Sequence, residues 1–258
     1  MTLAAVTLSR EGAMLADRLA QELPGTDLYV HEKVSGDWAA RPFAGIVELT
    51  EQIFPKYRGL VYVAPCGVVV RALAGCLKHK TADPAVVAVD VGGRWAVSLL
   101  SGHEGGANDL AVTVANILRA EPVISTTTEA LKTVIVGIGC RRGAKSGKII
   151  TAVKEALREC GLEASQVRLL SSADIKSNEP GLLEAASELK VPLRFISSEE
   201  IRNSRRNFRH SAFVEQKVNL PAVAEPAALL AGRRTTLILK KRVYNGVTVA
   251  LARESCLW

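Results

Sequence analysis

A chain of 258 residues is long enough for about two domains of ordinary size. Hydrophobic residues make up 48% of it and charged residues 23%, which supplies a core and excludes a bulk disordered protein. Neither a signal peptide nor the roughly 20-residue apolar run of a membrane helix occurs, so we predict a cytoplasmic protein with no membrane partner.

The cysteines and histidines follow no metal or disulfide pattern. The five cysteines are an odd number with no Cys-x-x-Cys pair, and the four histidines have no ligand spacing. We therefore predict reduced thiols, no bound metal ion and no cofactor held by the protein. The cysteines are Cys66, Cys76, Cys140, Cys160 and Cys256.

The charge is divided unevenly along the chain, whose net charge is +7. Residues 1–130 hold 11 Lys and Arg against 14 Asp and Glu, net −3, and residues 131–258 hold 22 against 12, net +10. The second half is therefore expected to meet an anion, for which nucleic acid, phosphate and a polycarboxylate are the candidates.

Short apolar runs alternate with helical periodicity from end to end. In the first half, strands are expected at residues 3–9, 59–65, 85–90, 95–100 and 122–126, and helices at 13–23, 67–75 and from 108. In the second half, strands are expected at 133–140, 167–172, 192–197, 235–240 and 246–252, and helices at 147–160, 180–189 and from 198. This alternation is typical of an α/β fold with two layered α/β/α domains and mainly parallel or mixed sheets. We place the domains at residues 1–130 and 131–258.

The stretch "SGHEGGAND" at residues 101–109 joins a predicted strand to a predicted helix. Its glycines let a ligand approach the backbone, and the first-turn N–H groups favour an anion or a developing oxyanion. The alternative is a tight turn with Asn108 as helix cap and the glycines serving packing alone. His103 is a candidate proton carrier or a lone surface histidine. Ser101 is a poor nucleophile candidate because no Gly-x-Ser-x-Gly elbow surrounds it.

Two acidic residues flank the strand predicted at residues 85–90. Asp90 ends this strand, where α/β sheets bind ligands, and Asp83 precedes Pro84. Ordinary turn chemistry explains both positions equally well, because aspartate is common before proline and glycine in turns.

The stretch "VGIGCRRGAKSGK" invites a phosphate-loop interpretation that its spacing does not support. Ile149 stands where a magnesium-binding Ser or Thr is required, and the glycines match a dinucleotide-binding turn only loosely. Arg141 and Arg142 remain as paired guanidiniums suited to carboxylates or phosphates. Cys140 is an activated thiol or a buried structural cysteine. The basic run "RNSRRNFRH" at residues 202–210 is interpreted as a solvated loop, because it has too few aromatic residues for RNA binding.

Several long motifs in order resemble one known family. These are "GVVVRALAG", "KTADPAVVAVD" and "SLLSGHEGGAND", followed by "VGIGCRRG", "SSADIKSNEPGL" and "GVTVALAR". They are similar to those of the cobalt-precorrin-5A hydrolases of anaerobic cobalamin biosynthesis. The resemblance covers residues 59–123 and 133–253, nearly the whole chain. The chain resembles a short form, because the middle segment that lies between the two parts in this family is almost absent.

The resemblance implies a reaction and a substrate class. The δ-lactone of a cobalt-bound contracted macrocycle is opened, and the C20 carbon leaves with its methyl group as acetaldehyde. Cobalt enters as part of the substrate, so no further cofactor is implied. The carboxylates of such a corrinoid account for the net charge of +10 in the second half without nucleic acid.

Within this reaction each motif receives an expected role. His103 is expected to act as general base on water, with Glu104 or Asp90 orienting the imidazole. Ser101 is counted with them among the catalytic residues. The backbone N–H groups of Gly105, Gly106 and Ala107, in the loop that ends at Asn108, are expected to bind the oxyanion. The residues expected to bind substrate are Arg71 and Lys80 in the first half, and Arg141, Arg142, Lys176 and Glu179 in the second.

Two other functions stay open at this stage. One is a corrinoid-binding accessory protein without chemistry, and the other is an RNA-binding protein that uses the basic half. A homo-oligomer and a hand-off of product to other enzymes of the pathway also stay open.

Overall fold

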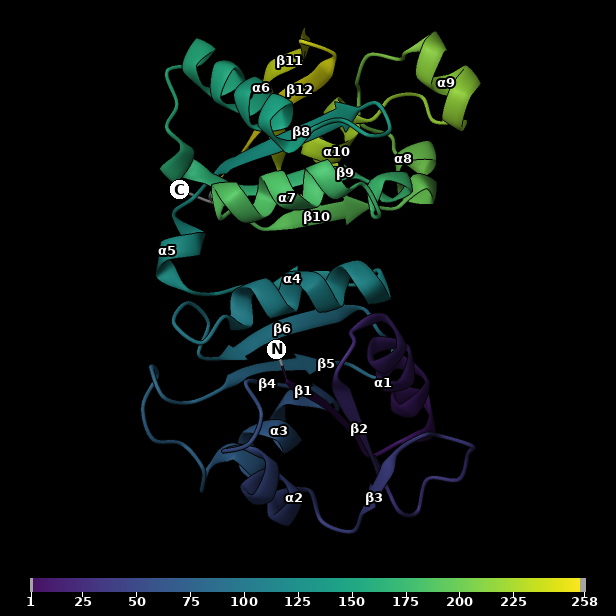
Figure 1. Ribbon diagram of the computed structural model, residues 1–258, viewed down its shortest axis with the longest axis vertical. Helices are drawn as coiled ribbons and strands as arrows, with labels where there is room; N and C mark the ends of the chain where they lie inside the picture. The colour runs from purple at the N-terminus through teal and green to yellow at the C-terminus, as the bar shows by residue number, and fades with distance from the viewer. Residues whose placement is uncertain (1, 256–258) are drawn as a thin grey trace. The chain divides into compact units, whose positions relative to one another are not determined.

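The chain folds into two compact units, Met1–Thr126 and Thr127–Trp258. The computed structural model describes residues 2–255, without the side chains of residues 212–214, so Cys256 lies outside the described residues. Each unit is a mixed β-sheet with helices on both faces, so the predicted α/β fold is confirmed (Figure 1). The division between the units falls four residues before the predicted boundary.

Unit 1 contains a seven-stranded sheet in the order β3-β2-β1-β4-β5-β6-β7. The first five of these strands are parallel, β6 is antiparallel to β5, and β7 is parallel to β6. The strands are β1 Leu3–Thr7, β2 Thr26–His31, β3 Arg41–Phe43, β4 Gly59–Val63, β5 Ala85–Val89, β6 Trp95–Leu100 and β7 Glu121–Val123.

Four helices cover this sheet, two on each face. They are α1 Arg10–Glu22, α2 Ile46–Ile53, α3 Cys66–Leu73 and α4 Ala107–Leu118. The apolar residues of α1 and α4 share one core cluster and those of α2 and α3 share another. Helix α1 begins at a cap that the sequence encodes, because the Ser9 hydroxyl accepts a hydrogen bond from the Gly12 N–H at 3.0 Å.

The reversed direction of β6 decides where the loop after it lies. In the antiparallel register Leu100 pairs with Val86 and Ala96 pairs with Val89. The end of β6 therefore lies at the edge of the sheet where β5 begins. The loop of residues 101–106 stands at that edge, next to the segment that enters β5.

Unit 2 contains a five-stranded sheet in the order β10-β9-β8-β12-β11. Strands β8, β9 and β10 are parallel, and β12 is antiparallel to both of its neighbours. The strands are β8 Val134–Cys140, β9 Val167–Ala173, β10 Leu193–Ile196, β11 Thr235–Tyr244 and β12 Val247–Glu254. The helices are α5 Thr127–Ala130, α6 Ser146–Glu159, α7 Pro180–Leu189, α8 Ser198–Asn203, α9 Ala212–Val218 and α10 Ala224–Leu230.

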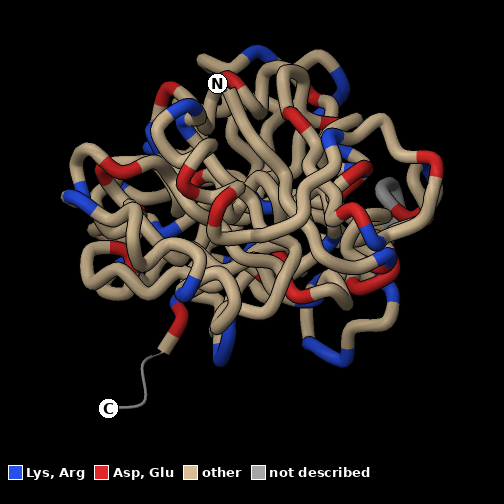
Figure 2. Tube along the Cα trace, turned by 90° about the horizontal axis from the view of Figure 1, so that it is seen from below, with Lys and Arg blue, Asp and Glu red and all other residues tan. Residues whose placement is uncertain are grey.

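The helices of unit 2 also divide between two faces. Apolar side chains of α6 and α7 pack on one face of β8, and those of α8 and α10 pack on the other. Charged residues of both signs lie mainly along the outer loops and helices of the trace (Figure 2). Within the described residues, no helix is long and apolar enough to cross a membrane.

Every predicted strand and helix is found, and six further elements are present among the described residues. These are β2, β3, α2, α5, α9 and α10. Strand β11 is also longer than predicted, because the expected run ends at Lys240 and the strand continues to Tyr244.

Candidate functional site

The loop of residues 101–106 is a turn closed by its own backbone. The Ser101 carbonyl accepts hydrogen bonds from the N–H groups of Gly105 at 3.1 Å and Ala107 at 3.2 Å, and the Gly102 carbonyl accepts one from Asn108 at 3.0 Å. Two of the three donors predicted for an oxyanion are therefore already used, and that part of the prediction is wrong. Among the described residues, the Gly106 N–H has no hydrogen-bond acceptor.

The glycines of this loop serve two purposes. A Cβ at Gly105 would lie 2.4 Å from the Ser101 Cβ, and one at Gly102 would lie 2.7 Å from the Thr126 Cγ2. These two glycines are required by packing. Gly106 differs, because it has φ +85° and nothing lies within 4 Å of its ideal Cβ position. Among the glycines of this turn, Gly106 is thus the one with open space beside its backbone.

Asn108 holds the loop in place instead of capping the helix. Gly106 occupies the cap position of α4. The Asn108 side chain is buried, accepts a hydrogen bond from the Ser98 hydroxyl at 2.8 Å and donates one to the Thr126 hydroxyl at 3.0 Å. It therefore ties β6 to the segment that follows β7.

Ser101 is an anchor of the turn and no nucleophile in this conformation. Its φ is +57°, a left-handed backbone conformation that is uncommon for serine. The residue is buried, and its hydroxyl has no hydrogen-bond partner among the described residues. A buried hydroxyl without a neighbouring base cannot attack a substrate, so this conformation does not support a catalytic role for Ser101.

His103 and Glu104 lie exposed at the tip of the loop. The Glu104 carboxylate forms an ion pair with Lys80, with Oε1 and Nζ 2.9 Å apart. The hydrogen bond from Lys80 holds the pKa of Glu104 below its ordinary value. Glu104 is therefore engaged by Lys80, and the two residues join the loop to the segment before β5.

The segment of residues 78–84 lies beside the loop and carries a histidine that the sequence analysis missed. His79 Nδ1 and the Thr81 hydroxyl are 2.8 Å apart. Asp83 has a structural role, because both of its carboxylate oxygens accept the Lys78 N–H at 3.1 Å. The signal for His79 was its position immediately before the "KTADP" motif, which begins at Lys80.

Asp90 does not orient His103. It follows β5 and therefore lies at the opposite edge of the sheet from the loop after β6. Its carboxylate accepts hydrogen bonds from the backbone N–H groups of Gly92, Arg94 and Trp95 and pairs with the Arg94 side chain. Burial opposes ionisation, but these donors outweigh it and lower the pKa of Asp90. Asp90 builds the β5–β6 hairpin.

Arg71 is exposed in the last turn of α3, and its Nη1 donates to the Gly67 carbonyl of the same helix at 3.1 Å. This contact leaves most of the guanidinium accessible. The structure joins Arg71 to no other predicted site residue, so its role toward substrate stays a prediction.

The loop of residues 141–145 in unit 2 is closed by a distant carboxylate. Glu179 is 5% exposed, and its Oε1 accepts the Gly143 N–H at 2.7 Å while its Oε2 lies 3.3 Å from the Lys176 Nζ. A Cβ at Gly181 would lie 1.9 Å from the Ala144 carbonyl oxygen, so α7 approaches the loop closely. Lys176 and Glu179 therefore pair with each other and Glu179 holds the loop, so their role toward substrate stays a prediction.

Arg141 and Arg142 remain exposed on this loop, as their predicted role requires. The start of α6 and Asn245 line an open groove of about 500 Å³. Its lining residues are Gly147, Lys148, Thr151 and Asn245. Burial raises the pKa of the Cys140 thiol, although Lys176 acts in the opposite direction. This favours the structural interpretation of Cys140 over an activated thiol. Among residues 2–255, no cluster of His, Cys, Asp and Glu is suited to hold a metal ion.

Known families match both units. A family described as cobalamin synthesis G N-terminal matches residues 48–129, and one described as cobalamin synthesis G C-terminus matches residues 134–252. The chain belongs to the cobalamin synthesis G family. Its role is accordingly in cobalamin biosynthesis. Only four residues separate the two matched regions, and both loops described above lie inside them.

Individual relatives agree with this assignment. A cobalt-precorrin-5A hydrolase of Salmonella typhimurium is 27% identical, with 97% of each chain covered. Protein CobE of a Sinorhizobium species is 33% identical over 51% of this chain and 86% of its own. A crystal structure of CobE, a protein from the cobalamin biosynthetic pathway, has 31% identity and a TM-score of 0.45 over 48% of this chain and 91% of its own.

The alignment with the Salmonella relative is longer than this chain. It extends over 342 residues, although this chain has 258. The relative therefore contains residues that have no counterpart here.

Proposed function

We propose that this protein is a cobalt-precorrin-5A hydrolase. It opens the δ-lactone of its corrinoid substrate and releases the C20 fragment as acetaldehyde, which gives cobalt-precorrin-5B. The observation that carries the proposal is the match to a relative of that name over 97% of both chains. The cobalt is part of the substrate, and the protein supplies the groups for hydrolysis.

His103 is the proposed general base. Its imidazole is exposed at the tip of a loop whose backbone is fixed by three internal hydrogen bonds. A water molecule gives its proton to this imidazole as it attacks the lactone carbonyl, and the imidazolium then returns the proton to the departing ring oxygen. The hydroxyl so formed on C20 then loses its proton as the bond between C20 and the macrocycle breaks, so acetaldehyde leaves and the macrocycle keeps the electron pair and takes up a proton. The Gly106 N–H is the backbone donor left for the tetrahedral oxyanion.

Basic groups in each unit support binding of an anionic substrate. Lys80 shares its charge with Glu104 at 2.9 Å, and Arg71 belongs to the same unit. In unit 2, Arg141 and Arg142 are exposed on a loop that Glu179 holds in place. Guanidiniums of this kind pair well with the acetate and propionate groups of a corrinoid.

The test is incubation of the purified protein with enzymatically prepared cobalt-precorrin-5A. Acetaldehyde is measured together with the mass of the macrocycle. We expect acetaldehyde and a macrocycle that has lost the C20 fragment. Unchanged substrate in the presence of active protein would contradict the proposal.

A second candidate is a non-catalytic corrinoid-binding protein. The observation in its favour is the 33% identity to Protein CobE, whose name states no reaction, over about half of this chain. In the same assay this function predicts a protein–corrinoid complex of unchanged mass without acetaldehyde.

A further inference from the structure

The basic run after α8 is anchored to unit 2 much more firmly than a solvated loop. We call residues 204–211 the basic strap. They contain Arg205, Arg206, Arg209 and His210 and no acidic residue. Although most of their side chains are exposed, as the sequence suggested, the backbone is held at several points.

Glu225 provides the central anchor of the basic strap. It is 0% exposed in the first turn of α10. One carboxylate oxygen accepts the Arg209 N–H at 2.6 Å, and the other accepts the Lys241 N–H of β11 at 2.8 Å. A buried carboxylate that receives two backbone donors from two segments fixes those segments to each other.

Further contacts hold both ends of the strap along β11. The Arg206 guanidinium donates to the Thr235 carbonyl at 3.2 Å, and the Lys241 ammonium donates to the carbonyls of Arg209 and His210 at 3.1 Å each. The Ser211 N–H donates to the Pro221 carbonyl at 2.7 Å. The strap is thus held at several points of its backbone, while the Arg205 and Arg209 side chains stay exposed.

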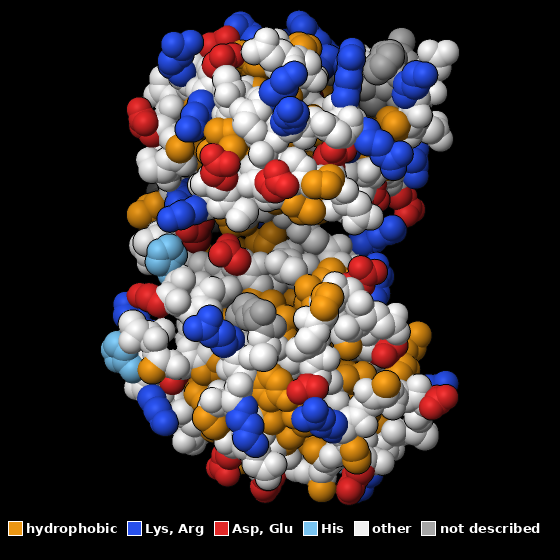
Figure 3. Space-filling view, in the orientation of Figure 1, with side chains coloured by type: hydrophobic (Ala, Val, Ile, Leu, Met, Phe, Trp, Pro, Cys, Tyr) orange, Lys and Arg blue, Asp and Glu red, His pale blue; other side chains and the backbone are white. Residues whose placement is uncertain are grey.

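The groups presented by the strap suit a flat ligand with several carboxylates. Phe208 and His210 stack with ring centroids 5.8 Å apart and an interplanar angle of 19°. Arg205 and Arg209 are exposed beside them, and no ion pair to either is found within the described part of the chain. Figure 3 shows Lys and Arg side chains gathered over the region of α8 and α9, where the strap lies.

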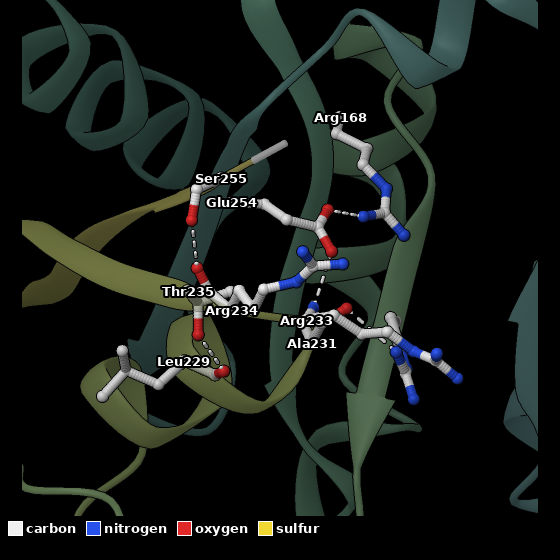
Figure 4. A network of polar contacts seen from close by, with 9 residues as sticks. Arg168, Leu229, Ala231, Arg233, Arg234, Thr235, Glu254 and Ser255 are labelled. Atoms are coloured by element: carbon white, nitrogen blue, oxygen red, sulfur yellow. Dashed lines mark hydrogen bonds and ion pairs between the residues drawn. The ribbon is translucent and has the colours of Figure 1, made fainter. Parts of the chain in front are cut away.

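In another arginine cluster of unit 2, the arginines bind to groups of the protein itself. Arg168 pairs with Glu254, whose other oxygen accepts the Arg233 N–H at 2.6 Å. The buried Arg194 donates to the Ala231 carbonyl at 2.9 Å. These contacts close the end of the sheet (Figure 4). Here the guanidinium of Arg168 is neutralised by a carboxylate of the protein, whereas the strap offers charge to a ligand.

We propose that the basic strap is a docking surface for a polycarboxylate macrocycle. Arg205 and Arg209 pair with peripheral carboxylates, and the Phe208–His210 pair contacts the edge or face of the macrocycle. This inference rests on the proposed function, because the ligand belongs to the class of its substrate. Glu225 is a positioning residue that acts through the strap backbone.

The probe is cobyrinic acid, a cobalt corrinoid with free carboxylates, compared with cobinamide, in which those carboxylates are amidated. Binding is measured by titration of the full chain. We expect the double substitution Arg205→Gln and Arg209→Gln to raise the Kd for cobyrinic acid about tenfold or more and to leave that for cobinamide within about twofold. The matched control is Lys154→Gln with Arg158→Gln, which removes the same charge from exposed positions of α6.

Glu225→Gln tests the positioning role separately. It removes one of two acceptors, so we expect faster hydrogen exchange at the Arg209 N–H and a Kd for cobyrinic acid raised severalfold. Unchanged binding in both the arginine and the Glu225 variants would overturn the inference. So would an equal loss in the α6 control, or tighter binding of an oligoribonucleotide than of cobyrinic acid in the wild type.

The acetaldehyde assay separates this inference from the proposed function. If the wild type releases acetaldehyde and the strap variants bind cobyrinic acid normally, the docking surface is wrong and the hydrolase stands. If the strap variants lose binding but the wild type releases no acetaldehyde, the docking surface stands and the reaction is wrong.

Discussion

The loops of residues 101–106 and 141–145 both join a strand to a helix through glycines, yet they are closed by different groups. The first is closed by the carbonyl of Ser101, which accepts from the N–H groups of Gly105 and Ala107 within the same turn. The second is closed by Glu179, which is 36 residues from Gly143. One loop is therefore stabilised locally, and the other depends on a buried carboxylate from a distant segment. Similar sequence patterns do not imply similar causes of rigidity.

The largest effect should come from removing the distant carboxylate. Glu179→Ala leaves the Lys176 ammonium without its buried partner and the Gly143 N–H without an acceptor. We expect a loss of about 3 kcal/mol in the free energy of unfolding, measured by denaturant titration. Replacing the exposed Arg141 and Arg142 by Gln is the control and should change it by less than about 0.5 kcal/mol. Equal losses would mean that Glu179 does not close the loop.

In the loop of residues 101–106, the proposed reaction depends on His103. His103→Ala should slow acetaldehyde release about 100-fold, or about 2.7 kcal/mol, because the general base is lost. The melting temperature should stay within about 1 °C, since the imidazole is exposed. His79→Ala is the control from the neighbouring segment. An unchanged rate in the His103 variant would remove this residue from the mechanism.

Local closure of the first loop is tested by Gly105→Ala. The added methyl would lie 2.4 Å from the Ser101 Cβ and 2.9 Å from the Ser101 carbonyl oxygen, so the turn must shift. We expect a loss of about 2 kcal/mol in the free energy of unfolding. Gly147→Ala is the control, because nothing lies within 4 Å of its ideal Cβ, and helix propensity should make it neutral or stabilising. Thermal unfolding of both variants distinguishes the two cases.

Ser101→Ala distinguishes a structural role of Ser101 in the turn from a role as nucleophile. The variant keeps the carbonyl that closes the turn and removes a buried hydroxyl that has no partner among the described residues. We expect the protein to be more stable by about 1 kcal/mol and the rate of acetaldehyde release to be unchanged. A loss of activity on the scale of His103→Ala would restore Ser101 to the chemistry.

The smallest effect is expected at Asp90. Its pKa is lowered in the folded protein, so its charge stabilises the fold above the ordinary aspartate pKa of about 3.9, and this contribution is lost as the pH falls through the folded value. Asp90→Asn should cost about 0.5–1 kcal/mol at pH 7. The difference from wild type should shrink below pH 4 in denaturant titrations. Acetaldehyde release should be unaffected, because Asp90 lies at the opposite sheet edge from His103.

The sequence predicted the fold where apolar runs are long and bounded by turns. Strands β4, β5 and β8 are buried along most of their length, and their runs of Val, Ile and Leu are unmistakable. Strand β2 was not predicted because Thr26, Asp27 and His31 are polar and lie at its two ends, which leaves only a short apolar run between them. Strand β3 has three residues and includes a proline, so no periodicity could reveal it.

The site was predicted in its residue types and only partly in its contacts. The motifs placed His103, Glu104 and Lys80 in two loops, and the structure joins those loops through an ion pair. The expectation for Asp90 was wrong because the short connection through Gly92 and Gly93 makes β6 antiparallel to β5, which puts the end of β6 at the opposite sheet edge from Asp90. The prediction of the oxyanion donors was wrong because the Ser101 carbonyl accepts the N–H groups of Gly105 and Ala107. Ser101 has a positive φ in this turn, which its residue type does not predict.

The basic strap also has a consequence for the assembly of this protein. The outermost strands β3, β7 and β10 have only three or four residues each, whereas β11 has ten and is the long free border of its sheet. Unprotected borders of that length recruit strands from other molecules. Lysines at the irregular middle of β11 and the segment tied to it by Glu225 make such recruitment unfavourable. The segment that offers charge to a ligand is thereby also held against the free border of the sheet.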